Sequence, residues 1–311
     1  MTLLSMKRVV CSCLTILSLA WPAWPQSRRM DEPFRVEVDA VNVLVTITDR
    51  QRGKFLKDLN REDFEVYEDG VLQEITNFSR ETDLPLSVAL CIDTSSSVKL
   101  KLEFEKEAAI DFLFTILRPT DQALLAEFDT AVTLLHDFTS NPNDLVEEIK
   151  RLRAGGGTSL YDAIYLISEQ KLLDAPGRRT IVVLSDGSDL TSTHTFDDAL
   201  RMAQKAEVAV YALSTTRFGA NIDHAGDNAL KQLTEATGGR VFFPYSTSQL
   251  SKAFAEVEEE LRSQYNLAYV PSNRKRDGTF RTIEVKVKRD DVNLRYRRGY
   301  YAPLPGVDPR D

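Results

Sequence analysis

Three nearly continuous apolar runs in the middle of the chain limit its possible folds more than any other feature. They cover Leu86 to Ile92, Thr180 to Leu184 and Val208 to Leu213, and the first two lead into Asp93 and Ser185-Asp186. Runs of this kind fit parallel strands that are buried on both faces of a sheet. Segments with helical periodicity lie between them. Alternating strands and helices predict an α/β fold with a doubly wound, mostly parallel sheet.

The helical pattern places six helices around this sheet. A further pair of apolar runs, Ala123 to Phe128 and Val132 to Phe138, is joined by only three residues. That connection is too short for a parallel crossover, so it predicts an antiparallel hairpin at a sheet edge. The expected helices are Leu100 to Leu117, Pro142 to Leu152, Leu160 to Leu173, Phe196 to Ala206, Asn228 to Ala236 and Ser248 to Arg262.

Both ends of the chain have the period of β-strands instead. Near the start, Asp69-Gly70 separates Phe64 to Tyr67 from Val71 to Phe78 and predicts a hairpin within a small antiparallel sheet over residues 34–80. Period-two segments return after the last helix. We therefore expect residues 34–83 and 263–302 to form one antiparallel β-sandwich, into which the domain of residues 84–262 is inserted. Two separate β appendages are the alternative.

The first 20 residues have the features of a secretory signal peptide. Lys7 and Arg8 precede the apolar run Val9 to Ala20, which is short for a membrane span. We expect cleavage of residues 1–20 and a secreted, periplasmic or cell-envelope location. An uncleaved segment that anchors the chain in a membrane is the alternative. Cleavage would leave Cys91 as the only cysteine, and its apolar neighbours predict a buried thiol outside any disulfide.

The charge balance excludes one class of partner. The formal net charge is −8, which argues against non-specific binding of nucleic acid. Residues 274–298 are locally basic, but apolar residues such as Ile283 and Val285 alternate with the charges. This alternation favours the solvated face of a strand pair. An acidic partner or an anionic membrane surface is the alternative reading of the basic segment.

Three polar segments carry the chemistry of the chain. Asp93-Thr94-Ser95-Ser96-Ser97 and Ser185-Asp186-Gly187 follow buried strands, and Gly155-Gly156-Gly157-Thr158 precedes a predicted helix. Ligands of open α/β sheets bind outside the carboxyl ends of the strands. Each segment alone is ordinary, because such residues also form turns and helix caps. Together they supply two carboxylates and three hydroxyls, which suit a hard cation such as Mg²⁺.

In this combination the segments resemble the metal ion-dependent adhesion site of von Willebrand factor type A domains. Asp93 to Ser97 matches the Asp-x-Ser-x-Ser motif of that family, Gly157-Thr158 its distal threonine, and Ser185-Asp186-Gly187 its third motif. The resemblance covers about residues 84–262. The flanks look similar to those of secreted bacterial proteins related to von Willebrand factor A.

The resemblance implies a role for each metal-site residue. Ser95 and Ser97 would bind Mg²⁺ (or Mn²⁺) directly, and Thr158 directly or through water. Asp93 and Asp186 would hold metal-bound waters or ligate the ion themselves. One position would stay open for the Asp or Glu carboxylate of a protein partner, which makes the expected function metal-dependent protein binding, as in adhesion.

We expect no enzymatic activity. A hydrolase needs a nucleophile with a base within reach, and His194, which follows Asp186 in the sequence, is predicted to be a surface residue. Asp93 could accept a phosphoryl group, but the second carboxylate of such motifs is replaced by Ser95. Two alternatives stay open: a structural or assembly module with a stabilising metal, and a metal-dependent hydrolase.

Overall fold

The computed structural model describes residues 40–80, 84–216 and 224–305. The predicted signal peptide and its cleavage site lie outside the described residues. Among the helices that are described, none is long and apolar enough to cross a membrane. The predicted boundaries at residues 83, 262 and 302 stay predictions.

The central part of the chain is an α/β domain with a mixed sheet, which confirms the predicted fold class. The strand order is β10-β9-β8-β5-β6-β7. All neighbours are parallel except β6 and β7, which form the predicted antiparallel hairpin at one edge. The strands are β5 (Leu86–Asp93), β6 (Gln122–Phe128), β7 (Val132–Thr139), β8 (Arg178–Ser185), β9 (Val208–Ser214) and β10 (Val241–Phe242).

Helices cover both faces of this sheet because its strands are apolar on both sides. Val88 and Leu90 of β5 pack in one core cluster, while Ala89 and Cys91 pack in the other. Cys91 is a buried free thiol, as predicted. The first face carries α1 (Leu102–Ile116), α2 (Asn143–Arg151) and α6 (Thr247–Leu261), and the second carries α3 (Leu160–Ile167), α4 (Phe196–Lys205) and α5 (His224–Thr237).

Three helices differ from the sequence prediction. The predicted start of α5 at Asn228 is wrong, because the helix already begins at His224. The predicted start at Leu100 is wrong: α1 begins at Leu102, because a 3-10 turn, η3 (Ser96–Val98), precedes it and leaves Leu100 91% exposed. The predicted helix Leu160 to Leu173 is α-helical only to Ile167 and then continues as a π-helical turn, η4 (Ser168–Leu172). Periodicity does not detect such changes of hydrogen-bond pattern, since the apolar side chains still face the core.

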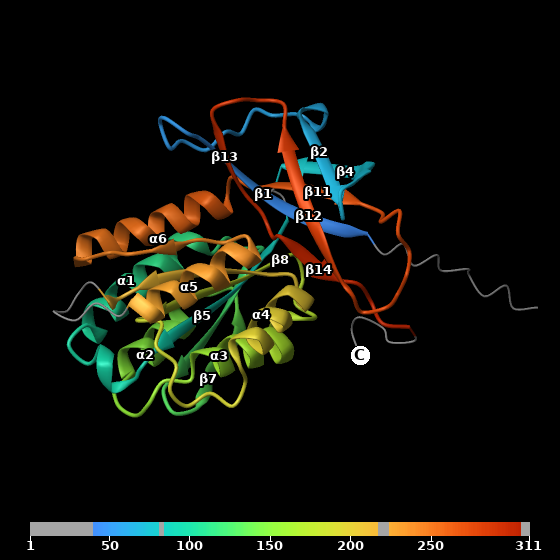
Figure 1. The fold of residues 1–311 in the computed structure, drawn as a ribbon. Helices are drawn as coiled ribbons and strands as arrows, with labels where there is room; N and C mark the ends of the chain where they lie inside the picture. Colours follow the sequence, from blue (N-terminus) through green and yellow to red (C-terminus); the bar gives the residue numbers. More distant parts are fainter. Residues whose placement is uncertain (1–39, 81–83, 217–223, 306–311) are drawn as a thin grey trace, which may run out of the picture. The chain divides into compact units, whose positions relative to one another are not determined.

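Strands from the two ends of the chain combine in a β-sandwich, and each of its sheets contains strands from both flanks. Figure 1 shows β1 from the start of the described chain beside strands from its end. The sheet orders are β13-β1-β11-β4 and β14-β12-β2-β3. The strands are β1 (Val41–Asp49), β2 (Phe64–Glu68), β3 (Val71–Gln73), β4 (Ile75–Arg80), β11 (Tyr265–Tyr269), β12 (Phe280–Val287), β13 (Val292–Arg295) and β14 (Gly299–Tyr301).

The N-terminal flank does not form a sheet of its own, so that part of the prediction is wrong. The hairpin at Asp69-Gly70 exists, and both residues have positive φ, as a tight turn requires. The run from Val71 to Phe78, however, is divided at Glu74. Its first part pairs with β2, and its second part crosses to the other sheet and pairs with β11.

The basic segment of residues 274–298 is only partly a solvated strand face. Lys286 is exposed, as predicted, but Arg281 and Arg297 are buried and pair with Glu68 and Glu207. In the same way, Arg295 pairs with Glu260, Arg289 with Asp58, and Lys286 with Glu284. Much of the local positive charge is therefore used in ion pairs within the chain.

Candidate metal site

The two carboxylates of the predicted site follow adjacent parallel strands. Asp93 is the last residue of β5, and Asp186 directly follows β8. The register pairs Ile92 with Leu184, so both loops leave the sheet side by side. The Ser185 hydroxyl donates a 2.6 Å hydrogen bond to Oδ2 of Asp93 and joins the two loops.

The loop after β5 brings the two predicted serine hydroxyls together. Oδ1 of Asp93 accepts a hydrogen bond from the backbone N–H of Ser95 at 2.8 Å. Ser95 is the N-cap residue of η3, and the turn places Ser97 on the same side. The two serine Oγ atoms are 2.9 Å apart. Thus two of the three predicted hydroxyl ligands lie next to each other, close to the Asp93 carboxylate.

The glycine run is tied to this loop. The N–H of Gly155 donates to the Thr94 carbonyl at 2.7 Å, and the Ser96 hydroxyl donates to the Gly156 carbonyl at 3.0 Å. Gly156 has a φ of +75°, and a Cβ there would lie 2.8 Å from Oδ2 of Asp129. The glycines therefore allow close packing of loops rather than a flexible connection.

Thr158 connects the glycine loop with the loop after β8. Its carbonyl accepts hydrogen bonds from the N–H groups of Leu190 and Thr191, at 2.8 and 3.0 Å. Its side chain is only 2% exposed. Its hydroxyl makes no hydrogen bond to another described residue, so it is available to water or to a ligand.

The Asp186 loop is held against helix α5. Gly187 has a φ of +80°, and a Cβ there would lie 2.4 Å from the carbonyl oxygen of Gly226. Oδ1 of Asp186 accepts a 3.1 Å hydrogen bond from the Ser188 N–H. The turn is therefore closed locally, and no larger residue fits at Gly187 without movement of the backbone.

The carboxylates are buried together without a basic partner. Asp93 is fully buried and Asp186 is 8% exposed. Burial raises the pKa of Asp93 to about 6, against the hydrogen bonds from Ser185 and Ser95, and the charge of Asp186 adds to the increase. In the part of the chain that the structure describes, no Lys or Arg side chain bonds to either carboxylate. A bound cation would supply the missing charge compensation.

Sequence reasoning missed a third acid in this region. Glu105 of α1 is 1% exposed, and neither carboxylate oxygen has a hydrogen-bond partner in the described chain. Burial, followed by the charge of Asp93, raises the pKa of Glu105 to about 8, and Lys101 opposes this increase. The Thr215 hydroxyl also lowers the pKa but lies outside hydrogen-bond geometry. A signal was present, since Glu105 lies on the same helix face as Leu102 and Ala109.

Two polar residues that follow Asp186 in the sequence have structural roles. Asp189 accepts hydrogen bonds from the Tyr161 N–H at 2.9 Å and from the Ser192 hydroxyl at 2.6 Å, and so it fastens the loop to the start of α3. His194 contacts Asp162 through Nδ1 at 2.7 Å and stacks on Tyr165. It is bound to α3 instead of facing Asp186.

The chemistry of the site depends on hydroxyls as much as on acids. No group of three or more His, Cys, Asp or Glu side chains suited to a metal ion occurs among the described residues. The five predicted residues instead combine two carboxylates with three neutral hydroxyls. Such an oxygen-only set fits a hard divalent cation. The buried Asp93 carboxylate, which has no basic partner among the described residues, agrees with that assignment.

Residues 88–188, which contain all five predicted metal-site residues, match the family model of the von Willebrand factor type A domain. By this match, residues 88–188 form part of a von Willebrand factor type A domain. The match begins in β5 and ends just after Asp186, so it includes the strands and loops that form the candidate site.

Known proteins with similarity to the chain come from several contexts. The UPF0353 protein of Mycolicibacterium gilvum is 24% identical over 201 residues, 56% of this chain, and the chain spans 60% of the length of that relative. An aerotolerance-related membrane protein from Bacteroides fragilis is 16% identical, with 56% of this chain and 98% of that chain covered and a TM-score of 0.45. The von Willebrand factor domain of the pilus tip protein Mfa5 from Porphyromonas gingivalis is 13% identical, with coverages of 57% and 94% and a TM-score of 0.45.

Another similar structure is proximal thread matrix protein 1 from the mussel byssus, whose adhesion-site motif is occupied by zinc. It is 16% identical, covers 62% of this chain and 49% of that chain, and has a TM-score of 0.49. At such low similarity, these structures do not indicate what this chain binds.

Proposed function

We propose that this von Willebrand factor type A domain binds a protein partner through a divalent cation, Mg²⁺ or Mn²⁺. The cation would be held by Asp93, Ser95, Ser97, Thr158 and Asp186. The observation that supports the proposal is that hydrogen bonds join the three loops that carry these residues and place the Ser95 and Ser97 hydroxyls beside the Asp93 carboxylate. Among the described residues, no basic side chain bonds to these carboxylates.

The residue types suit recognition of a carboxylate. Neutral hydroxyls from Ser95, Ser97 and Thr158 would leave the cation electrophilic, while Asp93 and Asp186 balance its charge. Mg²⁺ needs six oxygens in a near-octahedral shell and retains water unless a better ligand arrives. An Asp or Glu side chain of the partner would complete that shell. We therefore propose adhesion or assembly at the cell envelope or in the secreted space.

We propose binding and not catalysis, because the groups that a hydrolase would need are engaged elsewhere. His194, the histidine that follows Asp186 most closely, contacts Asp162 and Tyr165. A stabilising metal without a ligand function is the rival that an experiment must separate.

The test is titration calorimetry with Mg²⁺ and Mn²⁺ on the wild type and Asp93→Ala. Asp93→Ala should lose binding by tenfold or more, since it removes a charged group of the site. Asp111→Ala is the matched control, because Asp111 is an exposed carboxylate elsewhere on α1. Equal metal binding by wild type and Asp93→Ala would refute the site.

The role in binding is tested separately by capture of partners from an envelope extract, first with Mg²⁺ and then with a chelator. We expect capture that needs both the metal and Asp93. Capture that is unaffected by chelator would contradict the adhesion mechanism even if the metal binds. If the protein hydrolyses generic phosphate or ester substrates and Asp93→Ala does not, the hydrolase alternative is correct and the adhesion mechanism is wrong.

A further inference from the structure

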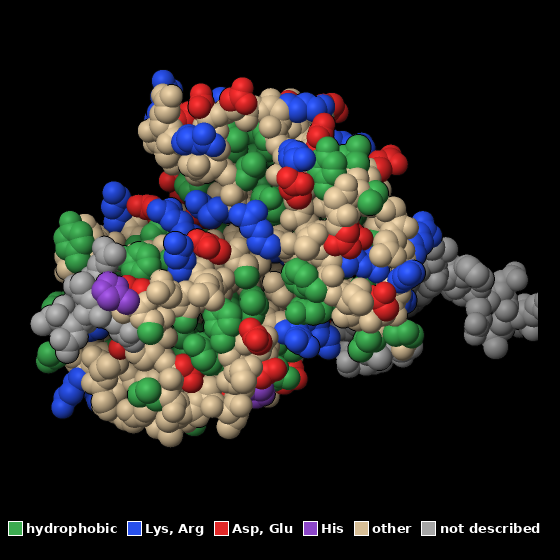
Figure 2. Space-filling view, in the orientation of Figure 1, with side chains coloured by type: hydrophobic (Ala, Val, Ile, Leu, Met, Phe, Trp, Pro, Cys, Tyr) green, Lys and Arg blue, Asp and Glu red, His purple; other side chains and the backbone are tan. Residues whose placement is uncertain are grey.

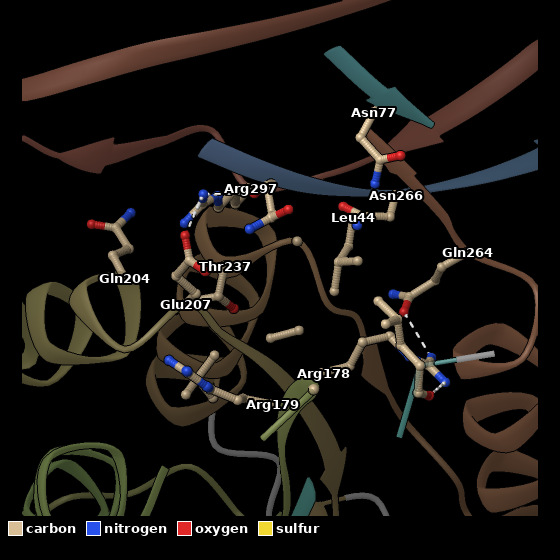
Figure 3. Close-up of a pocket in the computed structure, with 16 residues that line it drawn as sticks. Leu44, Asn77, Arg178, Arg179, Gln204, Glu207, Thr237, Gln264, Asn266 and Arg297 are labelled. Atoms are coloured by element: carbon tan, nitrogen blue, oxygen red, sulfur yellow. Dashed lines mark hydrogen bonds and ion pairs between the residues drawn. The ribbon is translucent and has the colours of Figure 1, made fainter. Parts of the chain in front are cut away.

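A second candidate site lies between the β-sandwich and the α/β domain. A cavity of about 360 Å³ is lined by residues from β1, β4, β8, β9, β11 and the ends of α4 and α5. This volume is within the range of small-molecule sites in proteins. Figure 3 shows the lining side chains from both domains around it.

The cavity is at the opposite end of the central sheet from the candidate metal site. Arg178 and Arg179 begin β8, whereas Asp186 follows its last residue. At about 3.3 Å per residue, the length of β8 separates the two places by roughly 20 Å. The cavity is therefore distinct from the metal site, and the two can be tested independently.

The lining has an excess of positive charge. Arg178, Arg179 and Arg297 contribute to it, and Glu207 is the only acidic residue among the described residues that line it. Arg297 is 8% exposed and uses Nη2 to bond to the Asn42 carbonyl at 2.6 Å and to Glu207 at 2.9 Å. Figure 2 shows Lys and Arg side chains gathered along the junction between the sandwich and the helices.

Two polar side chains of the lining have hydrogen-bonding atoms that are not used within the described chain. Arg179 is held by the carbonyls of Ala175 and Ala206, at 2.8 and 3.0 Å, so its third nitrogen, Nη2, is positioned without a hydrogen bond to any described residue. Gln204 is only 6% exposed, and its carboxamide also has no partner in the described chain. These unpartnered polar atoms are accessible to solvent, so an anion in the cavity would replace water as their hydrogen-bond partner.

We propose that this cavity binds a small anion that carries a carboxylate or phosphate group. The fixed guanidinium of Arg179 supplies charge-assisted hydrogen bonds to the anion, and the Gln204 carboxamide supplies a neutral donor. Glu207 limits the affinity because its negative charge lies in the same lining. Binding does not require the divalent cation.

The first experiment is titration calorimetry of the full chain with succinate and with inorganic phosphate, in chelator and at constant ionic strength. Saturable binding of either probe is expected, and the stronger one identifies the anionic group. Gln204→Leu should weaken binding severalfold and Arg179→Gln roughly tenfold or more. The absence of saturable heat with both probes would overturn the proposal and leave a hydrated junction between domains.

Removal of a negative charge from the lining distinguishes binding in this cavity from general attraction of anions to the protein surface. Glu207→Gln should tighten anion binding a few-fold, because it removes the only carboxylate of the lining. Lys231→Gln, at an exposed position of α5, is the control and should leave the affinity unchanged. Asp93→Ala should also bind normally. If Arg179→Gln does not fold, Gln204→Leu and Glu207→Gln still decide the matter, since unchanged affinity in both would overturn the proposal.

Discussion

Buried carboxylates in two regions of this molecule are compensated in different ways. In the β-sandwich, Glu68 accepts hydrogen bonds from the hydroxyls of Tyr269 and Tyr300, at 2.8 and 2.9 Å, and pairs with Arg281 at 3.3 Å. In the α/β domain, Asp93 and Asp186 are buried with hydroxyl and N–H donors but no basic partner in the described chain.

The difference separates a structural cluster from a candidate binding site. A buried carboxylate that is paired and hydrogen-bonded within the chain has no need of a ligand, and the removal of one partner leaves the other uncompensated. A carboxylate that is buried without such a partner is destabilising unless a cation binds. The first arrangement should therefore respond most strongly to mutation, and the second to metal and pH.

The largest effect is expected from Glu68→Ala. This change leaves the Arg281 guanidinium, which is only 3% exposed, without its carboxylate. The free energy of unfolding should fall by about 3–5 kcal/mol. Urea denaturation measures the loss, and Glu284→Ala, at an exposed carboxylate of β12, serves as the control. If the free energy of unfolding falls by less than about 1 kcal/mol, Glu68 is not held by its partners in the way that separates it from Asp93 and Asp186.

A pH-dependent effect of about 2–4 kcal/mol is expected at Glu105. Its pKa is raised by burial to about 8 from an ordinary value of 4.5. The folded state therefore holds this proton more tightly than the unfolded state, and stability declines as the pH rises through this interval. Glu105→Gln should lack that decline.

The measurement is the difference in unfolding free energy between Glu105→Gln and the wild type, at about pH 5 and about pH 9 in chelator. The difference should shift in favour of the variant at the higher pH. Saturating Mg²⁺ should reduce the shift, because a nearby cation favours the charged carboxylate. A difference that is independent of pH would show that Glu105 does not titrate in this range.

Metal addition should stabilise the wild type by roughly 1–3 kcal/mol when the ion exceeds its dissociation constant tenfold to a hundredfold. Asp93→Asn should show no such gain. Its stability in chelator should equal or exceed that of the wild type, since it removes a buried charge. A thermal unfolding series with increasing Mg²⁺ tests this, and a similar gain in both proteins would place the metal elsewhere.

The smallest effect on stability is expected at Ser97, an exposed residue of η3. Ser97→Ala should change the unfolding free energy in chelator by less than about 0.5 kcal/mol, yet weaken Mg²⁺ binding. Ser96→Ala is the neighbouring control; it loses the hydrogen bond to Gly156 but no proposed ligand. Equal metal affinity in the two variants would exclude Ser97 from the site.

The sequence alone determined the α/β core and the five residues of the candidate metal site. Continuous apolar runs such as Leu86 to Ile92 have few alternatives to a strand buried on both faces. The candidate ligand residues directly follow such strands or precede a helix. Their positions in the sequence therefore place them at the edge of the sheet where the parallel strands end. Even Glu105 was detectable, as an acid on an apolar helix face.

Only the tertiary structure decided the arrangements that join distant parts of the chain. The alternation along β12 places Arg281 on the same face as Ile283 and Val285. Nothing local identifies its partner, however, because Glu68 is 213 residues away in the sequence. The crossing of the chain at Glu74 likewise depends on how the two sheets of the sandwich pack. The cavity beside Arg179 depends on how the sandwich meets the α/β domain. Periodicity in the sequence indicates which face of a helix or strand is buried. Which side chain contacts that face depends on how the elements pack together in three dimensions.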